Sequence, residues 1–260
     1  MERTTNAAIL CGGRGERLKP LSDYYQKTMI PVGPKKLPIL AYIIALLKRH
    51  GITRVALLTG YRADEVMHYF GDGSQQGMNL TYSEDIKSAR GSLNATANAL
   101  ANGAISRCNE LLVYYGDILT DLDITAVLEV HRKKKADATL VLGKGYTLPV
   151  GVAEVRGGKV TAFREKPQLN LSVTTGTVVL GPKAMALAKA VASPRRTDLM
   201  ADFVPELLKK GGKVVPFYIN REWFDVGTVD SFEKLNEALA RNPLKYAAGV
   251  SNTSPLGVLQ

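Results

Sequence analysis

Three glycines and two basic side chains that follow the first apolar run could bind a phosphate. The run "NAAILC" leads into Gly12, Gly13 and Gly15, and Arg17 follows shortly after. Glycine has no side chain, so its backbone can approach a ligand closely and offer N–H groups to phosphate oxygens. The guanidinium of Arg17 and the ammonium of Lys27 would add positive charge. The pattern favours a phosphate-binding loop, and a mobile, solvated glycine turn is the alternative.

Two common glycine motifs do not fit this loop. A dinucleotide-binding fingerprint needs a third glycine where Leu18 stands, and it needs a helix immediately afterwards. A P-loop counted from Gly12 would need Gly-Lys where Arg17 and Leu18 stand. What remains is GGxGxRL, followed by Pro20, Lys27 and "MIPVG".

Cysteine and histidine offer little further chemistry. Cys11 and Cys108 do not form a CxxC pair, and His50, His68 and His131 lack the spacing of metal ligands. A zinc site bound by these residue types is therefore not expected. Two cysteines cannot form a disulfide framework, which fits a reducing compartment.

The elements that must position the loop alternate between strand and helix. Short apolar runs bounded by glycine predict buried strands, and longer runs with helical periodicity predict helices between them. This alternation predicts an α/β fold, Rossmann-like, with a mostly parallel central sheet flanked by helices. Ligands bind such sheets at the carboxyl ends of the strands, where both the glycine loop and the Gly116-Asp117 step lie. The expected strands span 6–11, 54–60, 79–84, 110–117 and 136–143, and the helices 38–51, 63–70, 92–103 and 123–135.

The pattern changes near residue 150. Short strands with tight glycine turns follow, at 151–155, 156–165 and 174–181, and they predict a smaller, partly antiparallel part. Helices at 182–191 and 199–210, a strand at 213–219 and a helix at 230–241 complete the expected order.

Composition limits the partners and the location. The chain has 34 Lys and Arg against 24 Asp and Glu, a formal charge of +10, which predicts an anionic partner. The densest basic run, "HRKKKAD", ends an expected helix, where lysines complement the helix dipole. No recognition-helix or aromatic-studded pattern supports nucleic-acid binding. The N-terminus lacks an apolar signal region and no run could span a bilayer, so we expect a cytoplasmic protein that binds no membrane.

Five blocks in order give the chain a specific resemblance. They read "AAILCGGRGERLKPL", "QKTMIPVG…LPIL", "VYYGDILTDLDI", "GVAEVRGGKVTAFREKP" and "EWFDVGTVDSFEKLNEAL". The sequence resembles the sugar-1-phosphate nucleotidylyltransferases, mannose-1-phosphate guanylyltransferases and glucose-1-phosphate nucleotidylyltransferases among them. The resemblance implies one nucleotidyltransferase domain over 1–260, with a nucleotide-binding half at about 1–145, a sugar-phosphate-binding half at about 146–245 and a tail at 246–260. Many members carry a left-handed β-helix as well, and from the length of the sequence we expect none here.

The resemblance implies a reaction between an NTP and a sugar 1-phosphate that gives an NDP-sugar and pyrophosphate. Such a site positions and neutralises two anions and needs no protein nucleophile. Asp117 and Asp225 match the aspartates that bind Mg²⁺, the expected cofactor. Arg17 and Lys27 match the cations at the nucleotide phosphates, and Lys166 matches the lysine of the sugar phosphate.

The same resemblance implies two sets of binding residues. The nucleotide set consists of Leu10, Gly12, Gly13, Gly15, Gly91 and Ser92. The sugar-phosphate set consists of Gly151, Glu165, Lys166 and Thr174. Asp121 and Asp123, close to Asp117, are expected to act as N-caps of the following helix.

Departures from the family pattern leave the substrates open. Gln26 replaces a usual proline, Glu16 replaces a commoner threonine, and Asn94 interrupts the segment beside the base. Thr174-Thr175-Gly176 stands where an Asn-x-Gly would contact the sugar. The donor could be GTP, dTTP or UTP, and the acceptor mannose or glucose 1-phosphate. A catalytically inactive relative that binds an NDP-sugar is the alternative, and a homo-oligomer is left open.

Overall fold

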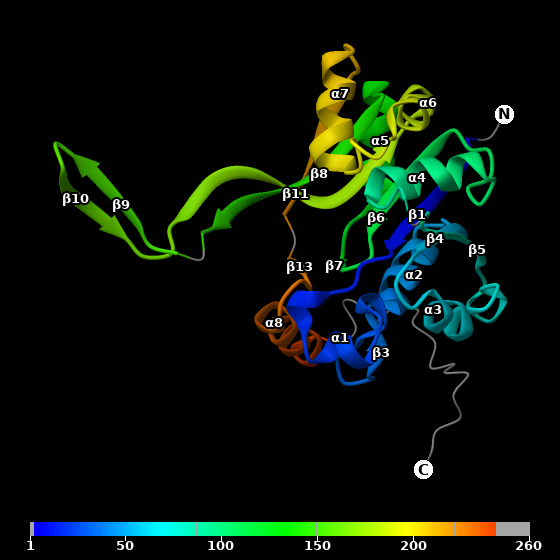
Figure 1. Ribbon diagram of the computed structural model, residues 1–260, viewed down its shortest axis with the longest axis horizontal. Coiled ribbons are helices and arrows are strands. Elements are labelled where there is room, and N and C mark those ends of the chain that lie inside the picture. Colours follow the sequence, from blue (N-terminus) through cyan, green and yellow to red (C-terminus); the bar gives the residue numbers. More distant parts are fainter. Residues whose placement is uncertain (1–2, 87, 149, 221, 243–260) are drawn as a thin grey trace.

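A twisted seven-stranded sheet forms the centre of the computed structural model, which describes residues 3–86, 88–148, 150–220 and 222–242 (Figure 1). The strand order is β12-β8-β11-β6-β1-β4-β5. β1 pairs in parallel with β4 and β6, β4 with β5, and β12 with β8, whereas β11 runs antiparallel to both of its neighbours. The strands are β1 (Thr5–Cys11), β4 (Arg54–Thr59), β5 (Asn79–Glu84), β6 (Glu110–Tyr115), β8 (Ala138–Thr147), β11 (Gln168–Leu180) and β12 (Val214–Ile219).

Helices cover both faces of this sheet, because successive residues of its central strands point to opposite sides and are apolar on both. Ala7 and Ile9 of β1 belong to one core cluster, and Ala8 belongs to the other. The first cluster packs beneath α2 (Ile39–Arg49), α3 (Ala63–Phe70), α5 (Ile124–Lys134) and α8 (Val229–Arg241). The second packs beneath α4 (Ser92–Ala101), α6 (Pro182–Val191), the π-helix η4 (Leu199–Phe203) and α7 (Val204–Lys209). The α/β expectation with a mostly parallel sheet is confirmed.

Short helical turns and two-stranded pairs connect these layers. They are the helical turns η1 (Glu16–Leu18), α1 (Leu21–Tyr24), η2 (Lys27–Met29) and η3 (Ser74–Gln76), and the paired strands β2 (Pro31–Val32) with β3 (Leu37–Pro38) and β7 (Ile118–Thr120) with β13 (Trp223–Asp225).

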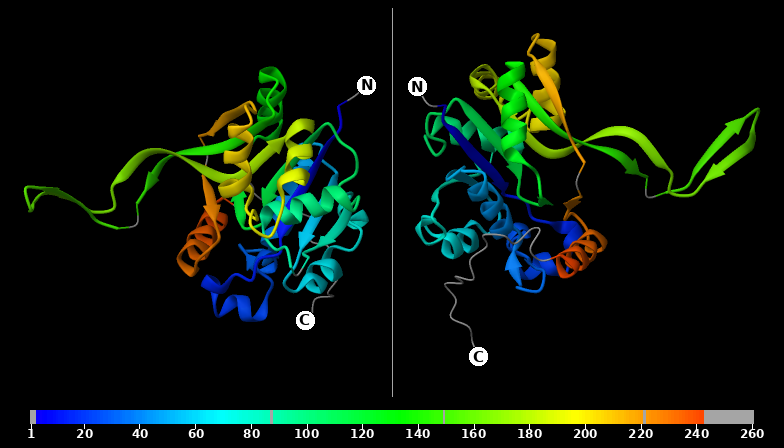
Figure 2. Two further views of the ribbon diagram at one scale, coloured as in Figure 1. Left: turned by 45° about the horizontal axis from the view of Figure 1, so that its top comes forward. Right: turned by 180° about the vertical axis from the view of Figure 1, so that it is seen from behind.

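The antiparallel part forms an arm that projects from the body in every view (Figures 1 and 2). β8 and β11 continue past the sheet as a paired ribbon as far as the Thr147–Gln168 register. The hairpin of β9 (Val152–Arg156) and β10 (Lys159–Arg164) forms its tip, with a turn at Gly157 and Gly158. We refer to residues 144–172 as the arm. The sequence predicted its antiparallel strands but not its projection.

Two further expectations concern the ends of the chain and the membrane. The expected tail, 246–260, lies outside the described residues. Within the described part of the chain, every helix is too short or too polar to cross a membrane.

Candidate functional site

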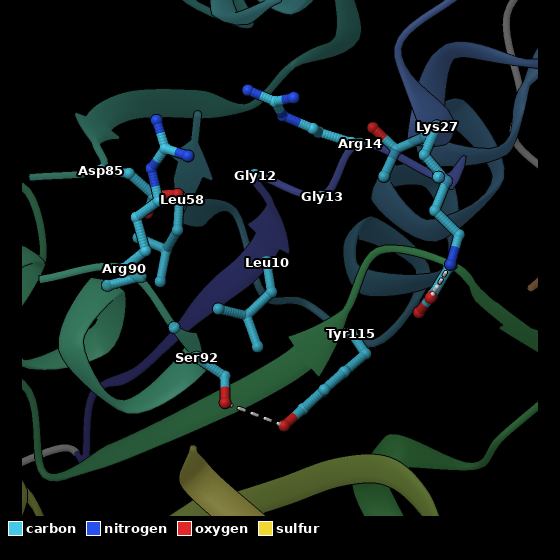
Figure 3. A pocket seen from close by; sticks show the side chains of 15 residues that line it. Leu10, Gly12, Gly13, Arg14, Lys27, Leu58, Asp85, Arg90, Ser92 and Tyr115 are labelled. Carbon is cyan, nitrogen blue, oxygen red and sulfur yellow. Dashed lines mark hydrogen bonds and ion pairs between the residues drawn. The ribbon is translucent and has the colours of Figure 1, made fainter. Parts of the chain in front are cut away.

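A cavity of about 390 Å³ opens at the carboxyl ends of β1, β4, β5 and β6 (Figure 3). Its size suits a small-molecule ligand, and its place is the one expected for ligands of an open α/β sheet. All six residues predicted to bind the nucleotide line it: Leu10, Gly12, Gly13, Gly15, Gly91 and Ser92. Lys27 and Asp117 line it as well.

The glycines of the loop are needed for different reasons. Gly15 has φ of 67°, and a Cβ there would lie 3.2 Å from Lys27 Cβ. A Cβ on Gly12 would lie 2.7 Å from Asp85 Oδ2, so the absence of a side chain leaves room for that carboxylate. A Cβ on Gly13 would have no neighbour among the described residues within 4 Å. The protein's own packing therefore disfavours a side chain at Gly15, allows one at Gly12 only if the Asp85 carboxylate moves, and leaves Gly13 open.

Gln26, which departs from the family pattern, fastens the Lys27 turn to the end of β1. The Gln26 amide is fully buried, and its Oε1 accepts from Thr28 N–H at 2.6 Å and from the Thr28 hydroxyl at 2.7 Å. Its Nε2 donates to the carbonyl of Cys11, the last residue of β1. The amide thus starts the η2 turn and sets the position of Lys27 relative to the glycine loop.

The two candidate metal-binding aspartates are brought together by the small β7–β13 sheet. Asp225 is the register partner of Ile118, the residue after Asp117. The backbone N–H of Val226 also donates to the Asp117 carbonyl at 2.8 Å. Residues more than a hundred positions apart are therefore neighbours here, and the Asp117 charge lies close enough to affect the Asp225 carboxylate.

Two cations surround this carboxylate pair. Lys27 Nζ donates to Asp117 Oδ2 (Figure 3). A Cβ on Gly227 would lie 3.0 Å from Arg17 Nη2 and 3.1 Å from Asp225 Oδ1, which places Arg17 on the Asp225 side. Enclosure of its carboxylate and the nearby Asp117 charge raise the pKa of Asp225, and the Lys27 and Arg17 charges oppose that rise. Four of the five predicted catalytic residues thus form one cluster.

This carboxylate pair fits a Mg²⁺ ion. Magnesium takes hard oxygen ligands and is commonly held by one or two carboxylates together with substrate phosphates and water. A cation between the two aspartates would relieve the like-charge repulsion that contributes to the raised pKa of Asp225. No cluster of three or more acidic, histidine or cysteine ligands occurs in the described ranges, so an all-protein metal cage is not what these residues offer.

The wall opposite the glycine loop is held by the Ser92 hydroxyl. It accepts from Tyr115 Oη–H at 3.2 Å and from the backbone N–H of Leu199 at 2.8 Å, and it donates to Asp198 Oδ2 at 3.1 Å. These bonds use the full capacity of a hydroxyl group, so Ser92 can meet a ligand only through its backbone. Burial raises the pKa of Tyr115 to about 12. Asn94 faces away from the cavity, with Nδ2 donating to the Ser193 carbonyl at 3.1 Å.

The predicted sugar-phosphate residues are divided between body and arm. Gly151, Glu165 and Lys166 lie beside β9 and β10 on the arm, apart from the cavity (Figures 1 and 2). A Cβ on Gly151 would lie 2.9 Å from Glu165 Oε2, so these two are neighbours. Thr174 stays near the body, within 3.8 Å of Met200 Sδ. The structure therefore does not bring Lys166 to the four-residue cluster.

The smaller expectations have mixed outcomes. Asp123 caps α5 by accepting from the N–H of Ala126 at 3.0 Å, as predicted, but Asp121 is buried and is not the cap. Glu16 is exposed, and nothing in the structure explains its charge beside the loop.

Some residues lining the cavity were not singled out from the sequence. Asp85 follows β5 directly, and Tyr115 ends β6. The rule that ligands gather at strand carboxyl ends could have found both, because both strands were predicted. Arg14, Leu58 and Arg90 also line the cavity.

A family model described as Nucleotidyl transferase matches residues 6–242. The chain belongs to this family. The model's range spans the glycine loop, the aspartate pair and the arm, and so includes every residue assigned to the site. The family resemblance drawn from the five motif blocks is thereby confirmed.

Known members of the nucleotidyl transferase family differ in base and sugar. The chain is 30% identical over 257 residues to a UTP–glucose-1-phosphate uridylyltransferase of Synechocystis, covering 90% of this chain and 63% of the relative. It is 28% identical to a mannose-1-phosphate guanylyltransferase of Mycobacterium tuberculosis, covering 91% of this chain and 65% of the relative. A heptose 1-phosphate guanylyltransferase of Aneurinibacillus thermoaerophilus is 29% identical, with 90% of this chain and 97% of the relative covered. The chain thus spans less than two thirds of the first two relatives.

Solved structures of similar proteins share the fold. One is a crystal structure of a candidate glucose-1-phosphate thymidylyltransferase from Bacillus anthracis with sucrose, at TM-score 0.74 and 26% identity, covering 92% of this chain and 96% of that one. HddC from Yersinia pseudotuberculosis, at TM-score 0.70 and 20% identity over 90% of this chain and 99% of that one, supports the fold alone.

Proposed function

We propose that this chain transfers a nucleotidyl group from an NTP to a sugar 1-phosphate, forming an NDP-sugar and pyrophosphate. The observation that carries the proposal is the cluster of Arg17, Lys27, Asp117 and Asp225 beside a cavity walled by the glycine loop. The names of the relatives support this reaction class, because they are uridylyl-, guanylyl- and thymidylyltransferases of sugar 1-phosphates. They do not agree on a base or a sugar.

The chemistry requires charge neutralisation more than proton transfer. An oxygen of the sugar phosphate attacks the α-phosphorus in line, the α–β phosphoanhydride bond breaks, and pyrophosphate leaves with that bonding pair. Backbone N–H groups of the glycine loop would hold the nucleotide phosphates. Arg17 would neutralise the charge that develops on pyrophosphate, and Lys27 would exchange its Asp117 partner for an α-phosphate oxygen.

Asp117 and Asp225 would hold the Mg²⁺ ion. When bound, the ion supplies positive charge at the phosphate oxygens and fixes their orientation. The departure of Lys27 toward the nucleotide would free Asp117 for this role, which links nucleotide binding to metal binding. The protein's own contribution is to fix the two carboxylates on the β7–β13 pair before substrate arrives.

The arm would supply the sugar-phosphate contacts. Lys166 has φ of 44°, in the left-handed region that a lysine rarely adopts, and such backbone strain clusters at functional sites. We assign residues 1–145 to a nucleotide-binding half and 146–245 to a sugar-phosphate-binding half within one domain. For Glu165 and Lys166 to act, the arm must approach a nucleotide cavity.

A cytoplasmic location is part of the same proposal. It is supported by Cys11 and Cys108, which are both free thiols. The positive charge of the chain is accounted for by two anionic substrates, and no described element resembles a nucleic-acid-binding motif.

Pyrophosphate release tests the reaction. The chain is incubated with each common NTP and with hexose and heptose 1-phosphates, with Mg²⁺ and with excess chelator. We expect pyrophosphate and an NDP-sugar only with Mg²⁺ and only when both substrates are present. An inactive NDP-sugar-binding relative would bind the product, seen by calorimetry, and release no pyrophosphate with any pair.

A further inference from the structure

Asp85 lies at the end of the cavity away from the catalytic cluster. In Figure 3, Asp85 and Arg90 lie on one side of Gly12 and Gly13, and Lys27 lies on the other. If the phosphates occupy the Lys27 side, the base of a bound nucleotide must extend toward Asp85. The apolar side chains of Leu10 and Leu58 line the cavity too and suit the faces of a base.

The backbone leaves a dedicated space for this carboxylate. A Cβ on Gly12 would lie 2.7 Å from Asp85 Oδ2, and one on Gly60 would lie 2.5 Å from the same oxygen. Gly60 follows β4, Gly12 follows β1 and Asp85 follows β5, so three adjacent strands end at this point. The two glycines allow the carboxylate to lie against the sheet edge while it still faces the cavity.

Within the described ranges, no donor forms a hydrogen bond or ion pair with the Asp85 side chain, and Arg90 acts on it only through its charge at longer range. Burial raises the pKa of Asp85, and the Arg90 charge offsets part of that rise. A carboxylate that has lost water without gaining a donor is costly, so the ligand is the natural source of donors. By contrast, the neighbouring Glu84 is exposed and does not line this cavity.

We propose that Asp85 selects guanine, so that the NTP of the proposed reaction is GTP. An ionised carboxylate only accepts hydrogen bonds, through two adjacent oxygens. Guanine offers two adjacent donors, N1–H and the 2-amino group, which would form a bidentate, charge-assisted pair. Adenine and cytosine place a ring acceptor beside their amino group. Uracil and thymine place a carbonyl on each side of N3–H. Each of these four bases would therefore place a hydrogen-bond acceptor next to the second carboxylate oxygen, where the two acceptors repel each other.

This inference rests on the proposed function for the place of the phosphates, and its test works without turnover. Binding of GDP, UDP, dTDP, ADP and CDP with Mg²⁺ is measured by calorimetry, alongside pyrophosphate release with the five triphosphates. We expect guanine to be preferred by roughly 5- to 150-fold over each other base, as for a good bidentate contact. Guanine-selective binding without pyrophosphate would overturn the reaction and leave the role of Asp85 standing.

The isosteric variant Asp85→Asn sharpens the test. An amide presents one acceptor and one donor, which complement N3–H and O4 of uracil and thymine. The preference for guanine over uracil should fall by roughly 5- to 150-fold. The matched control Glu84→Gln should retain the wild-type preference. A wild-type chain that binds another base as well as guanine would overturn the proposal, and so would an unchanged base ratio in Asp85→Asn. Should Asp85→Asn fail to fold, the wild-type panel decides alone.

Discussion

The nucleotide cavity and the arm are built in opposite ways. Around the cavity, single polar side chains hold several segments together. The buried Gln26 amide forms hydrogen bonds with Thr28 and Cys11, and the Ser92 hydroxyl forms three hydrogen bonds. On the arm, Val155, Val160 and Phe163 are 63%, 65% and 63% exposed. A two-stranded hairpin with an uncovered apolar face has little stability of its own.

This difference indicates how the two substrates would meet the protein. In the nucleotide half, Lys27 already pairs with Asp117, and Arg17 and Asp225 both lie beside Gly227, before any ligand arrives. The sugar-phosphate half holds Glu165 and Lys166 on a ribbon that projects from the body (Figure 2). Nucleotide binding should therefore depend on a preformed site, whereas sugar-phosphate binding should depend on movement of the arm.

Asp225→Asn should cause the largest loss of activity of the variants considered, and it changes only the preformed nucleotide site. The substitution removes a carboxylate that the proposed metal needs, so kcat should fall by roughly 10²- to 10³-fold, as when a group that stabilises transition-state charge is lost. Steady-state pyrophosphate release at limiting Mg²⁺ measures this. Asp230→Asn, at an exposed carboxylate on α8 that pairs with Lys234, is the control and should keep wild-type turnover. Near wild-type turnover in Asp225→Asn would refute the metal assignment.

Lys166→Ala should cause the next largest loss of activity, and it distinguishes the sugar-phosphate-binding half from the nucleotide-binding half. Loss of a charged contact should raise the KM for sugar 1-phosphate by roughly 10- to 100-fold and leave nucleotide binding unchanged. Lys159→Ala, elsewhere on the arm, is the control. An equal change for both substrates would mean that Lys166 belongs to the nucleotide site. No change would mean that the arm lysine is structural.

Gln26→Ala and Arg164→Ala compare the stability of the two regions. Gln26→Ala leaves the Cys11 carbonyl and the Thr28 N–H without their partner, so the free energy of unfolding should fall by about 2 kcal/mol or more. Arg164→Ala removes an exposed ion pair with Glu154 on the arm and should cost less than about 1 kcal/mol. Urea unfolding measures both. Equal costs would contradict the contrast between a packed cavity and a loosely held arm.

Much of the fold could be predicted from local pattern. The expected elements at 63–70, 79–84 and 182–191 match α3, β5 and α6 residue for residue, because their apolar periodicity and boundaries are clear. The small β7–β13 and β2–β3 pairs were missed, since two- and three-residue strands have no periodicity to detect. The projection of the arm was missed for another reason: alternation fixes which residues pair, not where a hairpin points.

The site was predictable where motif and strand end coincide. The glycine loop follows the expected strand 6–11, Asp117 ends the expected strand 110–117, and both line the cavity. Two features depend on tertiary contacts that no local pattern contains. The Ser92 hydroxyl forms hydrogen bonds with Tyr115, Leu199 and Asp198. The Asn94 side chain is turned into the fold, where it donates to the Ser193 carbonyl.

Nucleotide titration of Gly13→Ala tests most directly the central claim that the glycine loop binds the nucleotide. A Cβ at Gly13 meets nothing within 4 Å among the described residues, so the variant should match wild type in thermal stability. If the backbone there contacts phosphate, the added methyl should weaken NTP binding in the presence of Mg²⁺ by roughly 10-fold or more, the worth of one hydrogen bond to a charged group. Unchanged affinity in a folded Gly13→Ala variant would contradict the account.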